Sequence, residues 1–177
     1  MSTTPLDAFV LPTPAGPLSV LVTPEDDVVR ASGFSSLDDQ ASRLAPDLRV
    51  RGCRTVPPSG PVAEAVAAYA AGRLDALDDV VVAQPGGPFL QEAWRVMRSI
   101  PPGQTLTYAE LAAKAGRPAA VRAAGQACAR NLVAPFVPCH RVLRSDGTLG
   151  GYFFGPETKQ RLLDHERAEQ ADLRRVP

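Results

Sequence analysis

The segment at residues 84–88 limits how this chain can fold more than any other, because it places two prolines and two glycines within five residues. Such a run interrupts both helices and strands. The net charge of the chain also changes sign close to this segment. Residues 1–90 carry 6 basic and 11 acidic side chains, whereas residues 91–177 carry 13 basic and 8 acidic side chains. At 177 residues the chain has room for two small domains. We predict one domain over residues 1–85 and a second over residues 86–177.

The first domain is predicted to be α/β. Apolar or β-branched runs separated by turn residues predict strands, and two stretches with helical spacing predict helices. The expected strands are residues 8–11, 18–23, 28–33, 48–53 and 80–83, and the expected helices are residues 36–44 and 61–73.

The second domain is predicted to be mainly helical. An apolar stripe that includes Trp94 and Met97 predicts a helix over residues 89–100, which the Pro-Pro-Gly run at 101–103 ends. Thr105 or Thr107 can cap a second helix that runs to about residue 115, and a third follows over residues 119–130. Helix, tight turn and helix suit a DNA-binding helix-turn-helix, although any pair of antiparallel helices has the same pattern.

The helix at residues 119–130 consists almost entirely of small side chains. Val121, Ala124 and Cys128 share one stripe, which we expect to face the core, and Arg122 and Gln126 share another. A minor groove is about 6 Å wide and an ordinary helix about 10–12 Å across, so a slim helix approaches a groove more closely. The alternative is a tightly packed helix pair that needs small residues.

Basic side chains dominate residues 95–145, between Trp94 and Asp146, where eight Lys or Arg are accompanied by a single acidic residue, Glu110. A polyanion such as nucleic acid would bind there, and the alternative is an ordinary solvated basic surface. No run of about 18 apolar residues predicts a membrane span, and the first residues lack the pattern of a signal peptide. We expect a cytoplasmic protein without a membrane partner.

Three cysteines, odd in number and far apart, argue against a disulfide framework, and two histidines make a structural zinc site improbable. Cys53 and Cys128 are expected to be inert core residues, as a lone cysteine in an apolar run usually is. Cys139 differs because it follows Pro138 and precedes His140 and Arg141. Positive neighbours of this kind lower a thiol pKa from about 8.5 into the range of about 3.5–7.5. Adjacent residues of a strand point to opposite faces, so His140 would act on Cys139 through a bend or a bridging water.

The Pro-Cys-His-Arg-Val motif at residues 138–142, with Asn131 eight residues before the cysteine, closely resembles the O6-alkylguanine-DNA alkyltransferase family. The resemblance is continuous over residues 89–166. It includes the stretch that leads to Tyr108, the Arg-Ala-Ala-Gly at residues 122–125, the loop at 145–152 and the Leu-Leu-Asp-His-Glu at 162–166. The first 85 residues match loosely, in the Gly-Pro-Leu hairpin at 16–18.

The resemblance implies an α/β N-terminal domain with a small RNase H-like sheet and helices, followed by a mainly α C-terminal domain with a helix-turn-helix. It also implies that Cys139 is the nucleophile, that His140 removes its proton through a water and that Glu166 orients His140. Asn131 would hold the active-site turn. Tyr108 would press on the phosphate 3′ to the lesion and supply a proton to the departing guanine.

The implied partner is double-stranded DNA that contains O6-alkylguanine, approached through the minor groove, with O4-alkylthymine as a second candidate substrate. The lesion would be flipped out of the duplex, and Arg122 would fill its place. The expected DNA-binding residues are Arg122, Tyr108, Gln126, Arg130, Arg117 and Arg141, and the expected pocket residues are Tyr152, Val142, Phe153 and Pro138. One departure is Phe153-Phe154, where the family often has small residues.

The implied reaction is an irreversible transfer of the alkyl group to Cys139, once per molecule, with no cofactor, no metal and no obligate protein partner. Two other classes of function are compatible with parts of the sequence. One is an alkyltransferase-like protein that binds lesions without reacting, which typically has tryptophan in place of the cysteine. The other is a cysteine hydrolase, in which the base usually lies far from the nucleophile along the chain.

Overall fold

The protein is described by a computed structural model that covers residues 3–173, with side chains to residue 168. The chain divides into two compact units. The N-terminal unit comprises residues 1–85 together with Leu132–Phe136, and the C-terminal unit comprises residues 86–131 and 137–177. The placement of Leu132–Phe136 differs from the sequence-based expectation, which assigned all of residues 86–177 to the second domain.

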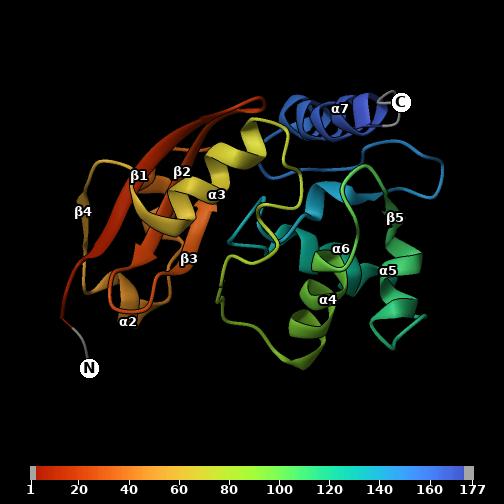
Figure 1. Cartoon of the computed structure of the whole chain (residues 1–177). Coiled ribbons are helices and arrows are strands. Elements are labelled where there is room, and N and C mark those ends of the chain that lie inside the picture. Colours follow the sequence, from red (N-terminus) through yellow and green to blue (C-terminus); the bar gives the residue numbers. More distant parts are fainter. Residues whose placement is uncertain (1–2, 174–177) are drawn as a thin grey trace. The chain divides into compact units, whose positions relative to one another are not determined.

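The N-terminal unit contains a four-stranded sheet in the order β3-β2-β1-β4 (Figure 1). The strands are β1 (Leu6–Thr13), β2 (Gly16–Thr23), β3 (Val28–Gly33) and β4 (Cys53–Thr55). The first three are antiparallel neighbours, and β4 is parallel to β1. Gly16, at φ 124°, permits the tight turn between β1 and β2, a backbone angle that other residues rarely adopt. The predicted strands at residues 8–11, 18–23 and 28–33 are thus confirmed.

Three helices accompany the sheet: α1 (Leu37–Ser42), α2 (Pro46–Arg49) and α3 (Gly60–Ala70). Leu6, Ala8, Leu21, Ala31 and Leu44 form a buried cluster against which α1 and α2 pack. Buried aliphatic side chains and Tyr69 line one side of α3, which packs against β1. The small sheet with helices expected for this part of the chain is therefore confirmed.

Two predicted strands were wrong in detail. Residues 48–53 are largely helix and turn, because Pro46 at the first helical position and Asp47 in the first turn start α2. Residues 80–83 make only an isolated parallel bridge, in which Val29 N–H donates to Val81 O and Ala83 N–H to Val29 O, both at 3.0 Å.

The C-terminal unit is mainly helical, as predicted. Its elements are α4 (Pro88–Arg98), α5 (Tyr108–Lys114), α6 (Val121–Ala129), the 3-10 turn η1 (Cys139–Arg141) and α7 (Pro156–Leu173), with the short parallel strands β5 (Leu106–Thr107) and β6 (Val142–Leu143). Thr107 caps α5 in a reciprocal capping box with Glu110. Gly116, at φ 80°, lies just beyond the end of α5. Helix α6 packs against α5, which gives the predicted helix-turn-helix.

The buried face of helix α6 differs slightly from the predicted stripe of Val121, Ala124 and Cys128. Ala124 and Ala127 are buried, whereas Val121 is 39% exposed and Cys128 is half-buried. The indole N–H of Trp94 in α4 donates to Ala127 O at 2.8 Å, so α4 contacts α6 at Ala127. Val121 is the first residue of the helix and lies beyond that contact. No helix among residues 3–173 is long and apolar enough to cross a bilayer.

Candidate active site

Cys139 lies on the tight turn η1, where the sequence had suggested an extended approach. Its side chain is 5% exposed. The side-chain amide of the buried Asn131 donates to Val137 O at 2.8 Å and to Cys139 Sγ at 3.2 Å. Asn131 therefore fixes the turn and also aims a donor at the sulfur. A donor in this position stabilises negative charge on the sulfur.

His140 and Glu166 form a buried pair. His140 Nε2 lies 2.8 Å from Glu166 Oε1, and both side chains are inaccessible to solvent. Burial raises the pKa of Glu166, but His140 and Arg141 outweigh this effect and hold the pKa well below its usual value. An ionised carboxylate can only accept hydrogen bonds, so Nε2 carries the proton of the neutral imidazole.

The other ring nitrogen of His140 is left as a base. Nδ1 is buried and makes no hydrogen bond with any residue in the described part of the chain. Burial lowers the pKa of His140 below its usual value, although Glu166 opposes the shift. A neutral imidazole whose Nε2 is held by a carboxylate can accept a proton at Nδ1.

Arg141 corrects a sequence-based prediction. It was expected to bind DNA, but its side chain is 4% exposed and its guanidinium donates to Glu166 Oε1 at 2.8 Å and to Ile100 O at 2.6 Å. Arg141 thus neutralises Glu166 from inside the fold. This arrangement explains why His140 stays neutral beside a carboxylate, because Glu166 already has a permanent cationic partner.

Tyr108 begins α5 and is half-buried. Burial raises its pKa, and the thiols of Cys128 and Cys139 raise it further, so the phenol keeps its proton at neutral pH. A Cβ atom at Gly150 would lie 3.1 Å from the Tyr108 hydroxyl oxygen. A larger residue at Gly150, which has φ 69°, would therefore be strained and would require the tyrosine to shift.

Lys159 was missed by the sequence analysis. It lies on α7, is fully buried, and donates from Nζ to Val142 O at 2.6 Å and to Leu149 O at 2.5 Å. It therefore ties β6 and the following loop to α7. Burial lowers the pKa of Lys159, and a thiolate at Cys139 opposes that shift. No sequence pattern indicated this role, because a lysine in a polar helix is usually solvated.

The expected pocket residues differ in exposure. Pro138 and Val142 are buried, and Tyr152 is half-buried with Lys159 Nζ 6.0 Å from its ring centre. Phe153 has a side chain that is 61% exposed, and its ring packs edge-to-face on Phe154 at 5.1 Å between centroids.

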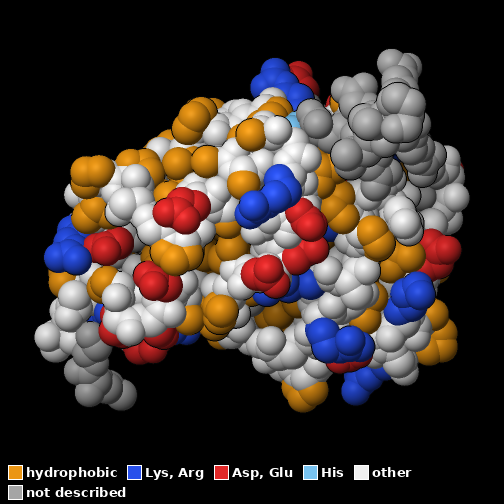
Figure 2. All heavy atoms as spheres, in the orientation of Figure 1, with side chains coloured by type: hydrophobic (Ala, Val, Ile, Leu, Met, Phe, Trp, Pro, Cys, Tyr) orange, Lys and Arg blue, Asp and Glu red, His pale blue; other side chains and the backbone are white. Residues whose placement is uncertain are grey.

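Four of the six expected DNA-binding residues are exposed: Arg117, Arg122, Gln126 and Arg130. Arg117 and Arg130 line one pocket of about 290 Å³ together with residues 87–90 at the start of α4. The Arg117 guanidinium lies 5.7 Å from the centre of the Phe89 ring. Figure 2 shows further Lys and Arg side chains over α4 and α5 on the visible face.

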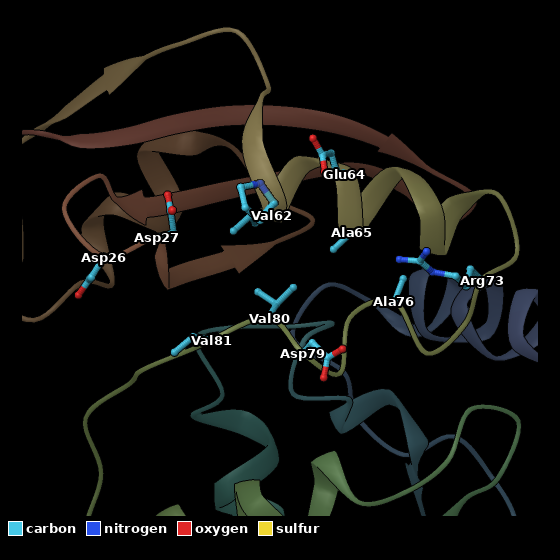
Figure 3. A pocket seen from close by; sticks show the side chains of 11 residues that line it. Asp26, Asp27, Val62, Glu64, Ala65, Arg73, Ala76, Asp79, Val80 and Val81 are labelled. Atoms are coloured by element: carbon cyan, nitrogen blue, oxygen red, sulfur yellow. The ribbon is translucent and has the colours of Figure 1, made fainter.

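A separate pocket of about 310 Å³ lies in the N-terminal unit and contains none of the predicted site residues (Figure 3). Its floor is aliphatic, and its rim carries Asp26 and Asp27 at one end and Arg73 at the other. Among the side chains of residues 3–168, no three His, Cys, Asp or Glu come together as a metal site would require.

Comparison with known proteins agrees with this geometry. A family model described as the DNA-binding domain of 6-O-methylguanine DNA methyltransferase matches residues 88–168. The methylated-DNA–protein-cysteine methyltransferase of Salmonella typhimurium is 40% identical over 157 residues, which cover 87% of this chain and 91% of that protein. This chain belongs to the methylated-DNA–protein-cysteine methyltransferase family. A member from Methanosarcina barkeri is 42% identical over 107 residues, 60% of this chain and 65% of that protein.

Solved structures of the methyltransferase family extend the likeness to both units. The crystal structure of Mycobacterium tuberculosis OGT in complex with DNA is 30% identical, covers 92% of this chain and 94% of that chain, and has a TM-score of 0.75. A methyltransferase from Pyrococcus kodakaraensis, at 21% identity and a TM-score of 0.60, shares the fold.

Proposed function

We propose that this chain repairs DNA by direct reversal, moving the alkyl group from O6 of a guanine to Cys139 Sγ once per molecule. The observation that carries the proposal is the pair of interactions on either side of the Cys139–His140 peptide. Asn131 donates to Sγ, and His140, next in the chain, is held by Glu166 with Nδ1 left as a base. A nucleophile, a base and a group that orients the base are the parts that nucleophilic catalysis requires.

The proposed reaction is a displacement at carbon. Cys139 gives its proton to His140 Nδ1 through a bridging water, and the thiolate attacks the alkyl carbon. The S–C bond forms as the O6–C bond breaks, and guanine takes a proton from Tyr108. The proton released by Cys139 replaces the one that Tyr108 gave up, so the reaction consumes no net proton and needs no cofactor.

The product thioether is stable, and the described residues offer no nucleophile placed to cleave it. We therefore expect one turnover per molecule. Asn131 and Lys159 hold the two segments on either side of the pocket, through Val137 O and through Val142 O and Leu149 O. Both are positioning residues, and Tyr152, Val142, Phe153 and Pro138 are proposed to line the guanine site.

Helix α6 is the proposed element for docking in the minor groove. Arg122 and Gln126 are exposed on it, four residues apart, and the other side chains are small. Flipping a base costs a few kcal/mol. Insertion of Arg122 and contacts of Arg117 and Arg130 with phosphates would offset that cost. Such contacts carry little sequence information, so affinity should depend weakly on sequence and steeply on salt.

In this proposal residues 86–177 bind DNA and transfer the alkyl group, residues 1–85 form a structural domain, and the protein acts in the cytoplasm.

The decisive experiment is incubation with duplex DNA that contains O6-methylguanine, followed by mass analysis of the Cys139 peptide. We expect one methyl group on Cys139 and unmodified guanine in the DNA. Cys139→Ala should abolish transfer and retain DNA binding, whereas Cys53→Ala, which removes an exposed thiol of the N-terminal unit, should transfer normally. Binding without any transfer by the unsubstituted protein would overturn the proposal and indicate a lesion-binding protein. Repeated turnover on excess DNA would overturn the single-use mechanism.

A further inference from the structure

The segment Leu132–Phe136 belongs to the N-terminal unit, although the residues on both sides of it belong to the C-terminal unit. The chain leaves the C-terminal unit after Asn131, passes through the N-terminal unit for five residues, and re-enters at Val137. Both of these flanking residues belong to the site described above. The excursion therefore interrupts the active-site segment immediately before the nucleophile.

Hydrogen bonds anchor the segment within the N-terminal unit. Ser32 of β3 donates its N–H to Leu132 O and its Oγ–H to Ala134 O, both at 2.8 Å, and forms a parallel bridge with Val133. Leu132 N–H donates to Gln84 Oε1 at 2.6 Å. Ser32 and Val133 are fully buried, and Ala134 is 1% exposed. The bond from Ser32 Oγ to Ala134 O is buried and that of Gln84 is partly buried, so a lost Ser32 hydroxyl leaves a buried carbonyl without its donor.

Little chain separates this anchor from the sulfur. Phe136 is the last residue of the segment, and only Val137 and Pro138 lie between it and Cys139. Proline fixes one of the backbone angles. Val137 is held on the other side by two bonds to its carbonyl, from Asn131 Nδ2 at 2.8 Å and from Cys139 N–H at 2.9 Å. A shift of the segment is thus transmitted to the turn that carries Cys139, because few free torsions remain to absorb it.

We infer that Ser32 and Gln84 are positioning residues for Cys139, which gives the sheet of the N-terminal unit a direct part in alkyl transfer. The inference rests on the proposed function. Reaction at carbon requires the sulfur to approach in line at near contact distance, and a displacement of about 1 Å can cost about 100-fold in rate. The side chains of Ser32 and Gln84 do not touch DNA or the reacting atoms in this account. They act through the backbone of residues 132–138.

The test compares Ser32→Ala with Ser19→Ala, a matched control. Ser19 lies on β2 of the same sheet, is 3% exposed, and donates from Oγ to Ser35 O at 2.6 Å, so its replacement removes a part-buried bond to a carbonyl that is far along the chain from residues 132–136. Gln84→Ala is paired with Gln84→Glu, which keeps an oxygen to accept from Leu132 N–H. Single-turnover transfer is measured at saturating O6-methylguanine duplex, together with the Kd for the duplex and the free energy of unfolding.

We expect Ser32→Ala and Gln84→Ala to lower the rate at saturating DNA by about tenfold, with the Kd for DNA within about twofold of the unsubstituted protein. Ser19→Ala should lose similar stability and keep its rate, and Gln84→Glu should recover most of the rate. Hydrogen exchange should show faster exchange at residues 132–137 in Ser32→Ala and not in Ser19→Ala.

Three results would overturn the inference: an unchanged rate in Ser32→Ala, an equal loss in Ser19→Ala, or no recovery in Gln84→Glu. Should Ser32→Ala fail to fold, the two Gln84 variants decide alone. Absence of transfer in the unsubstituted protein would instead refute the proposed function, whereas normal transfer there with unaffected variants would refute only the anchoring role.

Discussion

Replacement of Glu166 by glutamine tests the buried charge arrangement most directly. Glu166 accepts from His140 Nε2 at 2.8 Å and from Arg141 Nη2 at 2.8 Å, and it is fully buried. Glutamine keeps the shape and one acceptor oxygen but leaves the Arg141 guanidinium without its counter-charge. Removal of one partner from a buried ion pair costs about 3–5 kcal/mol. Since one acceptor survives, we expect about 3 kcal/mol, which lowers the Tm of a chain this size by about 6–12 °C.

The same substitution should also slow alkyl transfer. The amide N–H of glutamine can donate to His140 Nε2, which favours the tautomer with the proton on Nδ1 and removes the base. General base catalysis contributes about 10²–10⁴ in rate, so we expect a loss of at least about 100-fold. The assay is single-turnover transfer at saturating DNA, well below the Tm, beside denaturant unfolding. Glu157→Gln, an exposed change in the first turn of α7, is the control.

Transfer by Glu166→Gln at close to the unsubstituted rate would refute the view that the carboxylate sets the tautomer of His140. Unfolding within about 1 kcal/mol of the unsubstituted protein would refute the magnitude assigned to the buried pair.

Two further predictions concern salt and pH. Arg117→Gln combined with Arg130→Gln should reduce the slope of log K for DNA against log salt by about 1.8, or 0.9 per phosphate. Arg73→Gln in the N-terminal unit is the control and should leave this slope unchanged. Equal slopes in the double variant, the control and the unsubstituted protein would contradict the phosphate contacts. The folded pKa values of His140 and Glu166 lie below the ordinary 6.5 and 4.5, so the unfolded chain binds more protons than the folded chain. The contribution of these two groups to the free energy of unfolding is complete above about pH 6.5. It falls as the pH drops, first because of His140 and then because of Glu166. Unfolding free energies that stay flat from neutral pH to 4.5 would contradict this.

Local patterns in the sequence predicted β1, β2, β3 and most helices well, because each of these elements depends on neighbours a few residues away. β-branched runs with turn residues between them predicted β2 and β3, and Thr107 with Glu110 capped α5 where expected. Residues 48–53 failed because a short apolar run suits strand or helix, and Pro46 with Asp47 decided for helix.

Relations between distant residues could not be predicted in the same way. Arg141 was expected on the surface because arginine usually lies there, and its partner Glu166 is 25 residues away. Lys159 is an equivalent case, since its acceptors are backbone carbonyls of other segments. The family resemblance indicated Cys139, His140, Asn131 and Glu166 together, and in the structure Asn131 is hydrogen-bonded to Cys139 and Glu166 to the adjacent His140.

The excursion of Leu132–Phe136 through the N-terminal sheet limits how this chain can be rearranged. A cut at residues 84–88, the obvious place by composition, would yield an N-terminal fragment with the edge of β3 open and a C-terminal fragment whose catalytic stretch has lost its hydrogen-bond partners. The two halves should therefore not behave as interchangeable modules. A fusion of the C-terminal half to another protein should transfer the alkyl group only if the fusion also contains a strand equivalent to β3.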